Sequence, residues 1–163
     1  MHKAPSPDPR ADIKPLLVAA AIILRNEPAA PAETTTKILI AQRKADASAE
    51  GGKWEFPGGK VDPFEHPEAT VVREIKEELD LDITVDRIFD VASHVYDHPT
   101  KGPGQIILIC YLCGANSADF KLLDVADAKW VTVHELDEFQ FAEADIGTVA
   151  KLKGYLADPA FVT

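Results

Sequence analysis

The segment PEATVVREIKEEL, residues 67–79, constrains the fold of this chain more than any other part of the sequence. His66 precedes a proline at the first helical position, where the missing N–H breaks no hydrogen bond, and Glu68 favours the helix dipole in the first turn. The apolar residues follow at helical spacing and form one stripe: Val71, Val72, Ile75 and Leu79. The segment therefore predicts an amphipathic helix whose apolar stripe packs on the core.

Carboxylates crowd the loop and helix between Trp54 and Leu79. They are Glu55, Asp62, Glu65, Glu68, Glu74, Glu77 and Glu78. Like charges this close repel one another, and a stable fold avoids that cost unless a positive partner lies among them. Glu74, Glu77 and Glu78 stand at i, i+3 and i+4, so they share one arc of the predicted helix. A hard divalent cation needs several oxygens that converge in this way, whereas a solvated charged face is the alternative.

Three neighbouring features favour the metal site over the solvated face. The basic residues of the helix, Arg73 and Lys76, are fewer than its acids. The turn FPGGK lies just upstream, where bare glycine backbone can approach a ligand closely. Glu65 precedes Arg73 across the junction of loop and helix, so the two can pair and clamp the turn onto the helix.

Composition and charge limit the classes of partner. The chain has 163 residues, of which 46% are hydrophobic and 27% charged, and this predicts one globular domain with a proper core. Its net charge of −10 argues against a stable nucleic-acid complex and against binding to an anionic membrane. A phosphorylated substrate would then need local neutralisation by a metal ion or by a few Lys and Arg side chains.

The two cysteines and the N-terminus bear on the compartment. Cys110 and Cys113 lie in the apolar run IILICYLC, which predicts a strand, and their odd spacing places them on opposite faces. We therefore expect buried packing residues and neither a disulfide framework nor a CxxC redox or zinc site. The N-terminal residues lack an apolar core segment, and no later run reaches membrane-spanning length. A cytoplasmic protein without a signal peptide is the expectation.

The remaining pattern predicts strands mixed with two helices. Residues 1–14, rich in Pro, Ala and charge, are expected to be a flexible tail before a single domain at 15–160. Strands are predicted at residues 16–24, 37–43, 83–96, 104–113 and 128–136, the last ending in a short turn, with loops at 26–36 and 97–104. A closing helix is predicted at residues 145–156, with Ile146, Val149, Leu152 and Leu156 as its inner face. The predicted class is α/β, a sandwich around a mixed sheet.

Residues 59–81 resemble the Nudix box. The family pattern is Gly, five residues, Glu, seven residues, and then Arg-Glu-aliphatic-x-Glu-Glu-x-Gly-aliphatic; here Gly59 is followed by KVDPF, Glu65, HPEATVV and REIKEELDL. Only Asp80 departs, because the family usually has Gly there to end the helix in a left-handed conformation. Asp is among the residues that tolerate that conformation next best, so we expect a modest loss of stability and retained activity. EFPGGK resembles the MutT-type branch, and the likeness extends over about residues 16–156.

The resemblance implies a Nudix-type α/β/α sandwich and an enzyme that hydrolyses a nucleoside diphosphate linked to another moiety. It implies that Glu74, Glu77 and Glu78 bind Mg²⁺ or Mn²⁺. The carbonyl of Gly58 would be a further ligand from the loop. It also implies that Glu77 or Glu78 orients or deprotonates the attacking water.

The resemblance suggests roles outside the three helix acids as well. Arg73 and Glu65 would form a structural ion pair. Asp124 occupies the place of a loop acid that binds metal or water in MutT-like enzymes, and a solvated loop Asp is the alternative. Arg43 matches a substrate-contacting Arg of that branch, or is a surface Arg, and Lys60 could reach phosphate or pair with a carboxylate.

Asp145 stands where MutT-type proteins carry the polar residue that reads the base, commonly Asn. An ionised carboxylate only accepts hydrogen bonds, so it could accept from the exocyclic amine of cytosine or from an N–H of an oxidised guanine. The alternative is an N-cap for the helix that begins there. His94, Tyr96 and His98 could line the base pocket by stacking, or simply pack in their strand and loop.

The sequence therefore predicts a MutT-like pyrophosphohydrolase that acts on a nucleoside triphosphate. The first candidate is 8-oxo-dGTP, converted to monophosphate and pyrophosphate in nucleotide-pool sanitisation and thus in DNA repair. CTP or a modified pyrimidine triphosphate is the alternative, followed by a nucleotide sugar, a dinucleotide or a capped RNA end. A non-catalytic Nudix-fold binding module is the alternative from another class, although such modules commonly lose the box carboxylates. We expect a monomer or a homodimer.

Overall fold

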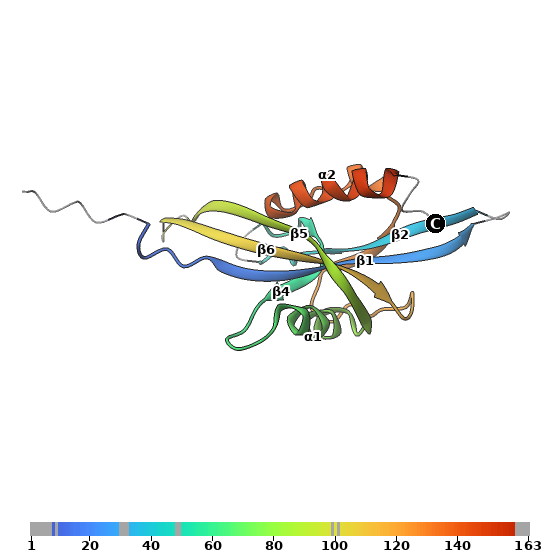
Figure 1. The fold of residues 1–163 in the computed structure, drawn as a ribbon, viewed down its shortest axis with the longest axis horizontal. Helices are drawn as coiled ribbons and strands as arrows, with labels where there is room; N and C mark the ends of the chain where they lie inside the picture. Colours follow the sequence, from blue (N-terminus) through green and yellow to red (C-terminus); the bar gives the residue numbers. More distant parts are fainter. Residues whose placement is uncertain are drawn as a thin grey trace, which may run out of the picture.

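The computed structural model describes residues 8, 10–29, 33–47, 50–98, 100 and 102–158. Within these residues a seven-stranded mixed sheet carries one α-helix on each face (Figure 1). The elements are β1 (Leu16–Ala29), β2 (Glu33–Gln42), β3 (Trp54–Glu55), β4 (Gly58–Lys60), α1 (Pro67–Leu79), β5 (Ile83–His98), β6 (Gly102–Ala115), β7 (Asp127–Val131), the 3₁₀ turn η1 (Glu135–Glu138) and α2 (Glu143–Ala157). This arrangement confirms the predicted α/β class.

The sheet places a pair of glycines against its central strand. Its order is β3-β2-β1-β6-β5, with β4 paired to β1 and β7 paired to β2, and among these described strands β1 and β6 are the parallel pair. Gly58 and Gly59 lie opposite Ala20 and Ala19 of β1. A Cβ atom on Gly58 would lie 2.2 Å from the carbonyl oxygen of Ala19, so only glycine permits this approach. The turn after β3 is thereby fixed beneath α1.

Each face of the sheet has its own apolar core, because successive strand residues point to opposite sides. Ile22 packs with Leu152 under α2, while Ile23 packs with Ile75 under α1. Cys110 belongs to the cluster under α2 and Cys113 to the cluster under α1, and both are buried free thiols. The prediction that the two cysteines face opposite ways is confirmed.

Both long hairpins extend further than the sequence predicts. Residues 26–36 were expected to form a loop, but 26–29 belong to β1 and 33–36 to β2, while 30–32 lie outside the described residues. The expected loop at 97–104 is likewise part of β5 and β6 at 97–98 and 102–104. The loop predictions were wrong because the backbone ladder continues through polar residues such as Thr35 and Thr36, whose branched side chains suit a strand.

The helices lie close to where the sequence predicts them, but one stripe position in each is wrong. α1 has the predicted bounds, whereas α2 begins at Glu143, ahead of the predicted Asp145. Val72 is 43% exposed and Ile146 is 55% exposed, although both were assigned to inner faces. Each follows a buried residue by about 100° of helical rotation, which turns it out of the interface. Thr70 and Thr148 are fully buried instead.

The expected tail at residues 1–14 falls mostly outside the described residues, which here include 8 and 10–14. Arg10–Asp12 form a turn before β1. Within the described part of the chain, no helix is long and apolar enough to cross a membrane.

Candidate active site

α1 is held by well-defined caps at both ends. The Nδ1 atom of His66 accepts a hydrogen bond from the backbone N–H of Glu68 at 3.2 Å, and this caps the N-terminus. At the other end Asp80 adopts the left-handed conformation, with φ 50°, and its N–H donates to the carbonyl of Lys76. The Asp80 carboxylate also pairs with Lys76 at 2.8 Å and with Lys121 at 2.6 Å. The helix therefore ends as predicted even though the usual glycine is absent.

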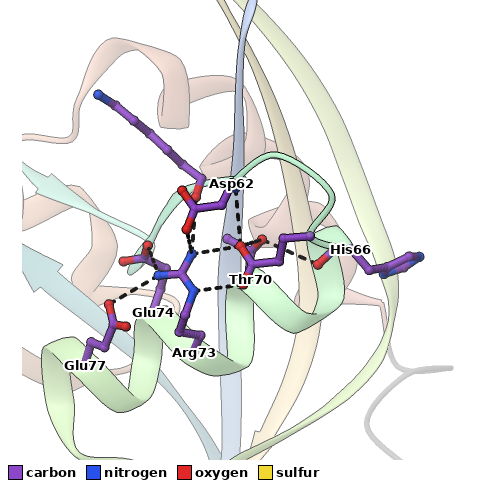
Figure 2. Close-up of polar contacts among 8 residues, drawn as sticks. Asp62, His66, Thr70, Arg73, Glu74 and Glu77 are labelled. Carbon is purple, nitrogen blue, oxygen red and sulfur yellow. Dashed lines mark hydrogen bonds and ion pairs between the residues drawn. The ribbon is translucent and has the colours of Figure 1, made fainter.

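Arg73 is the centre of the charge network on α1 (Figure 2). Its Nε and Nη2 atoms donate to the two carboxylate oxygens of Glu65 at 2.8 and 2.9 Å. Its Nη1 atom donates to Glu74 at 2.8 Å and to Glu77 at 3.2 Å. The hydroxyl of Thr70 also donates to Glu65 at 2.7 Å. Arg73, followed by Thr70, lowers the pKa of Glu65 to about 2. The predicted pair of Glu65 and Arg73 is confirmed, and the guanidinium also holds two of the helix acids.

Glu74 lies directly against the glycine turn. A Cβ atom on Gly59 would lie 2.6 Å from each carboxylate oxygen of Glu74, so the carboxylate occupies the space that the glycine leaves open. The Glu74 side chain is only 17% exposed, whereas that of Glu77 is 58% exposed. The three acids that share an arc of α1 are therefore in unlike surroundings.

Glu78 is the buried member of the three acids. Its Oε2 atom is buried and accepts no hydrogen bond from the described residues. Burial, followed by the negative charges of Glu55, Glu74 and Asp124, raises the pKa of Glu78 to about 9, although the backbone of Gly58 acts in the opposite direction. A cation bound at this unpaired oxygen, in a group of acids, would stabilise the ionised form of Glu78.

The loop before β7 brings Asp124 to the end of α1. The backbone N–H groups of Leu123 and Asp124 donate to the carbonyl oxygen of Glu78 at 2.9 and 3.2 Å. The Asp124 side chain is 69% exposed and pairs with Lys44 at 2.6 Å. Asp124 therefore lies near the buried acid, and its carboxylate is held by a lysine.

Glu55 is a site residue whose role was not predicted from the sequence. It is half-buried on β3, and its Oε2 atom accepts a hydrogen bond from Nη1 of Arg43 at 2.8 Å. Burial raises the pKa of Glu55 despite this partner. The charge of Glu55 raises the pKa of both Glu78 and Asp145, so it lies close enough to act on both acids. The sequence did contain one signal for such a role, because Glu55 is an ionisable residue between the aromatic residues Trp54 and Phe56.

Asp145 is the third residue of α2 and is 5% exposed. The N-cap is Ala142, so the N-cap alternative for Asp145 was wrong. Its Oδ1 atom accepts a hydrogen bond from the backbone N–H of Phe56 at 3.2 Å. Burial, followed by the charge of Glu55, raises the pKa of Asp145 to about 8, while Arg43 acts in the opposite direction. At neutral pH the Asp145 side chain is therefore largely a neutral acid that can donate as well as accept.

The other predicted substrate residues lie around these two centres. His94 on β5 faces the first residue of α2, with its Nε2 atom 3.3 Å from a carboxylate oxygen of Glu143. The ring of Tyr96 covers Gly104 of the neighbouring strand, where a Cβ would come within 2.5 Å of the ring. Lys60 is exposed at the end of β4. The structure thus brings His94 beside the start of α2, while Tyr96 packs against β6.

The acids of α1 and Asp124 fit a divalent cation chemically, but Glu74 and Glu77 are paired with Arg73 and Asp124 with Lys44. Among the described residues no group of three or more His, Cys, Asp or Glu side chains stands at metal-binding spacing. Two of these acids, Glu74 and Glu77, accept hydrogen bonds from Arg73 instead (Figure 2). All the candidate donors are hard oxygens, which is the chemistry that Mg²⁺ and Mn²⁺ prefer.

Known proteins resemble this chain in sequence and in fold. Residues 15–152 match the family model of the NUDIX domain. The chain is 36% identical over 138 residues to the CTP pyrophosphohydrolase of Escherichia coli strain K12, which covers 82% of this chain and 88% of the relative. It is 31% identical over 141 residues to the 8-oxo-dGTP diphosphatase of the same strain, covering 86% and 98%. The solution structure of the E. coli ORF135 protein matches with a TM-score of 0.67 at 31% identity, covering 94% of this chain and 99% of that one.

In this structure a mixed sheet lies between two helices, and the acidic helix is seated on a glycine turn with a group of carboxylates around it. The chain belongs to the Nudix family, as a Nudix hydrolase of the MutT-like branch. The family and the enzymatic nature predicted from the box are confirmed.

Proposed function

We propose that this Nudix hydrolase converts a nucleoside triphosphate to the monophosphate and pyrophosphate, with Mg²⁺ or Mn²⁺ as its cofactor. The observation that carries the proposal is the buried Oε2 atom of Glu78, which has no hydrogen-bond partner among the described residues. Glu55, Glu74 and Asp124 surround it with negative charge. A triphosphate adds further negative charge, so this group of acids can receive one only together with cations.

The proposed metal ligands are the side chains of Glu74, Glu77, Glu78 and Asp124 and the carbonyl oxygen of Gly58. A metal ion bound there would stabilise the charge of the polyphosphate in the transition state and lower the pKa of a bound water. Glu77 or Glu78 then orients the attacking water or accepts its proton.

The basic residues divide into positioning and phosphate-binding roles. Arg73 holds Glu65 and Glu74 and so fixes the acidic helix on the glycine turn. Lys60, exposed at the end of β4, supplies positive charge for the phosphates. Arg43 contacts the substrate from the end of β2 while its guanidinium stays paired with Glu55.

The first candidate substrate is 8-oxo-dGTP, on the basis of Asp145. A neutral carboxyl group presents one donor and one acceptor side by side. The oxidised guanine edge offers an N–H at position 7 and a carbonyl at position 6, which match that pair. Unmodified guanine has acceptors at both positions and does not match. The similarity to a relative named 8-oxo-dGTP diphosphatase supports this candidate.

The second candidate is CTP or a modified pyrimidine triphosphate. The cytosine edge offers an exocyclic N–H and a ring nitrogen acceptor, which also match a neutral carboxyl group. The relative with 36% identity is named CTP pyrophosphohydrolase, which favours this alternative. With 8-oxo-dGTP as substrate, the cellular role would be cytoplasmic removal of an oxidised nucleotide before DNA polymerases use it.

The test is a comparison of kcat/KM for 8-oxo-dGTP, dGTP, CTP, dCTP and 5-methyl-dCTP in the presence of Mg²⁺. The proposal expects 8-oxo-dGTP to exceed dGTP by at least about a hundredfold, because an unmatched buried polar group is strongly rejected. If a cytidine nucleotide has the highest kcat/KM, the second candidate replaces the first. Equal values for 8-oxo-dGTP and dGTP would contradict the base-reading role of Asp145.

A further inference from the structure

The N-terminus of α2 is capped by a residue from a distant loop. Its own N-cap, Ala142, has no side chain that can accept a hydrogen bond. Glu50, in the segment between β2 and β3, supplies the acceptor instead. Its Oε1 and Oε2 atoms lie 3.0 and 3.3 Å from the backbone nitrogen of Glu143, the first residue of α2. A carboxylate at this position also stabilises the helix dipole.

The cap belongs to a series of hydrogen bonds that joins two segments. The N–H of Trp54 donates to the carbonyl of Gln140 at 2.9 Å, and the N–H of Ala142 donates to the carbonyl of Trp54 at 2.8 Å. The Phe56 N–H then donates to Asp145 at 3.2 Å. Residues 50–56 and 140–145 are thus joined from Glu50 at one end to Asp145 at the other. The Asp145 end reaches the backbone of Phe56, just after β3, and the Glu50 end caps the first residue of the helix.

Glu50 itself is held in one arrangement. Lys53 pairs with its Oε1 atom at 2.9 Å. Its backbone φ of 52° is left-handed, which is uncommon outside glycine and persists only where the surroundings enforce it. His94 approaches the same place from β5 through its contact with Glu143.

We propose that Glu50 is a positioning residue for nucleobase selection, because it fixes the first turn of α2 and with it the carboxyl group of Asp145. The inference rests on the proposed base-reading role of Asp145. Removal of the cap frees the first turn, and the Asp145 carboxyl group is then no longer held at a fixed position beside the backbone N–H of Phe56. Discrimination between bases falls, while the acidic helix, which holds the reacting phosphates, is untouched.

The test compares Glu50→Ala, Glu50→Gln and the control Asp46→Asn. Asp46 is exposed in the same loop, so its substitution removes one negative charge and leaves the cap intact. The readouts are the ratio of kcat/KM and the ratio of Kd for 8-oxoguanine and cytosine nucleotides. We expect Glu50→Ala to change both ratios by about fivefold, the equivalent of one lost N-cap, while kcat on the better substrate stays within about threefold. Glu50→Gln keeps an acceptor oxygen and restores most of the ratio, and Asp46→Asn resembles the wild type.

An equal loss on all substrates, or unchanged ratios in Glu50→Ala, would overturn the inference, because the cap would then be structural only. Hydrogen exchange of the Glu143 amide provides a readout that does not depend on hydrolysis. It should speed up by at least about tenfold in Glu50→Ala, and an unchanged rate would show that the cap does not form. If the wild type binds nucleotides with a base preference but hydrolyses none, the proposed reaction fails, and the Kd ratio still decides the role of Glu50.

Discussion

The guanidinium of Arg73 lies 2.8 Å from the carboxylate of Glu74, its neighbour in sequence, and two of its nitrogens also donate hydrogen bonds to Glu65. One side chain therefore joins the loop acid that anchors the turn to the helix acid that rests on Gly59. The planar guanidinium of an arginine can donate to both carboxylates at once in this geometry, whereas the single ammonium group of a lysine cannot.

Arg73→Lys should consequently lower kcat while the fold survives. Without the planar guanidinium, Glu74 loses the donor that holds it against Gly59, so we expect a loss on the order of tenfold, typical of residues that orient metal ligands. The measurement is kcat at saturating Mg²⁺ together with the far-ultraviolet circular dichroism spectrum. Arg87→Lys is the matched control, because Arg87 is an exposed arginine of β5. A wild-type kcat in Arg73→Lys would contradict this role.

Glu77→Gln and Glu78→Gln should each cost at least about a hundredfold in kcat, because the lost charge contacts metal or the attacking water. Both variants should also bind Mn²⁺ more weakly, as measured by electron paramagnetic resonance in the absence of nucleotide. Glu68→Gln is the control, since Glu68 is exposed on the first turn of the same helix. Near-normal turnover and Mn²⁺ affinity in both variants would show that the acids of α1 do not bind the metal or the attacking water.

Asp145 should give base selection a dependence on pH. Its pKa of about 8 means that the carboxyl group is neutral below that pH and loses its proton as the pH rises through it. The preference for 8-oxo-dGTP over dGTP should therefore be steady from pH 6 to 7 and decline above pH 8. Asp145→Asn has no proton to lose, so its substrate ratio should not vary over this range. A wild-type ratio that is constant up to pH 9 would show that ionisation of Asp145 plays no part.

The same group should affect the free energy of unfolding. The folded pKa of about 8 lies above the ordinary value of 3.8, so the folded protein holds the Asp145 proton more tightly than the unfolded chain does. The stabilisation of the folded state by protonated Asp145 is therefore fully present below pH 4 and is lost as pH rises through 8. Asp145→Asn should thus gain stability relative to the wild type between pH 5 and pH 8. Urea unfolding at several pH values measures this difference. A difference that shrinks with rising pH would contradict the raised pKa.

Thr148→Val should destabilise the packing of α2 on β5. Thr148 is fully buried and donates to Asp90 at 2.8 Å, and Lys151 pairs with the other oxygen of Asp90 at 2.5 Å. Valine has the same shape but leaves Asp90 without one donor, at a cost of about 1–3 kcal/mol. Urea unfolding at pH 7 measures this loss, and Thr148→Ser, which keeps the hydroxyl, should recover most of it. Equal stability of Thr148→Val and the wild type would show that the bond contributes nothing.

Local features of the sequence predicted α1 and its ion pair correctly. The His66 and Pro67 start, the spacing of Val71, Ile75 and Leu79, and the left-handed Asp80 all act within one or two helical turns. The pairing of Glu65 with Arg73 spans a single turn and helix start, so chain geometry brings the two together.

Contacts between distant segments could not be predicted from the sequence. Glu50 caps α2 and Asp145 binds Phe56 across 93 and 89 positions of the chain. The hydrophobic periodicity of either segment cannot predict such a contact, because the contact depends on how the sheet places β3 beside α2. The hairpin lengths were missed for a related reason: backbone hydrogen bonds, which are the same for every residue type except proline, extend the strands past the apolar runs.

The most direct test of the central claim follows the products of hydrolysis by ³¹P nuclear magnetic resonance. The wild type and Glu78→Gln are each incubated with 8-oxo-dGTP and with CTP, in Mg²⁺ and in excess chelator. The account predicts that the wild type releases monophosphate and pyrophosphate in Mg²⁺ only, and that Glu78→Gln is slower by at least about a hundredfold. Release of inorganic phosphate with a diphosphate product, equal rates in chelator, or no turnover of either triphosphate would contradict it.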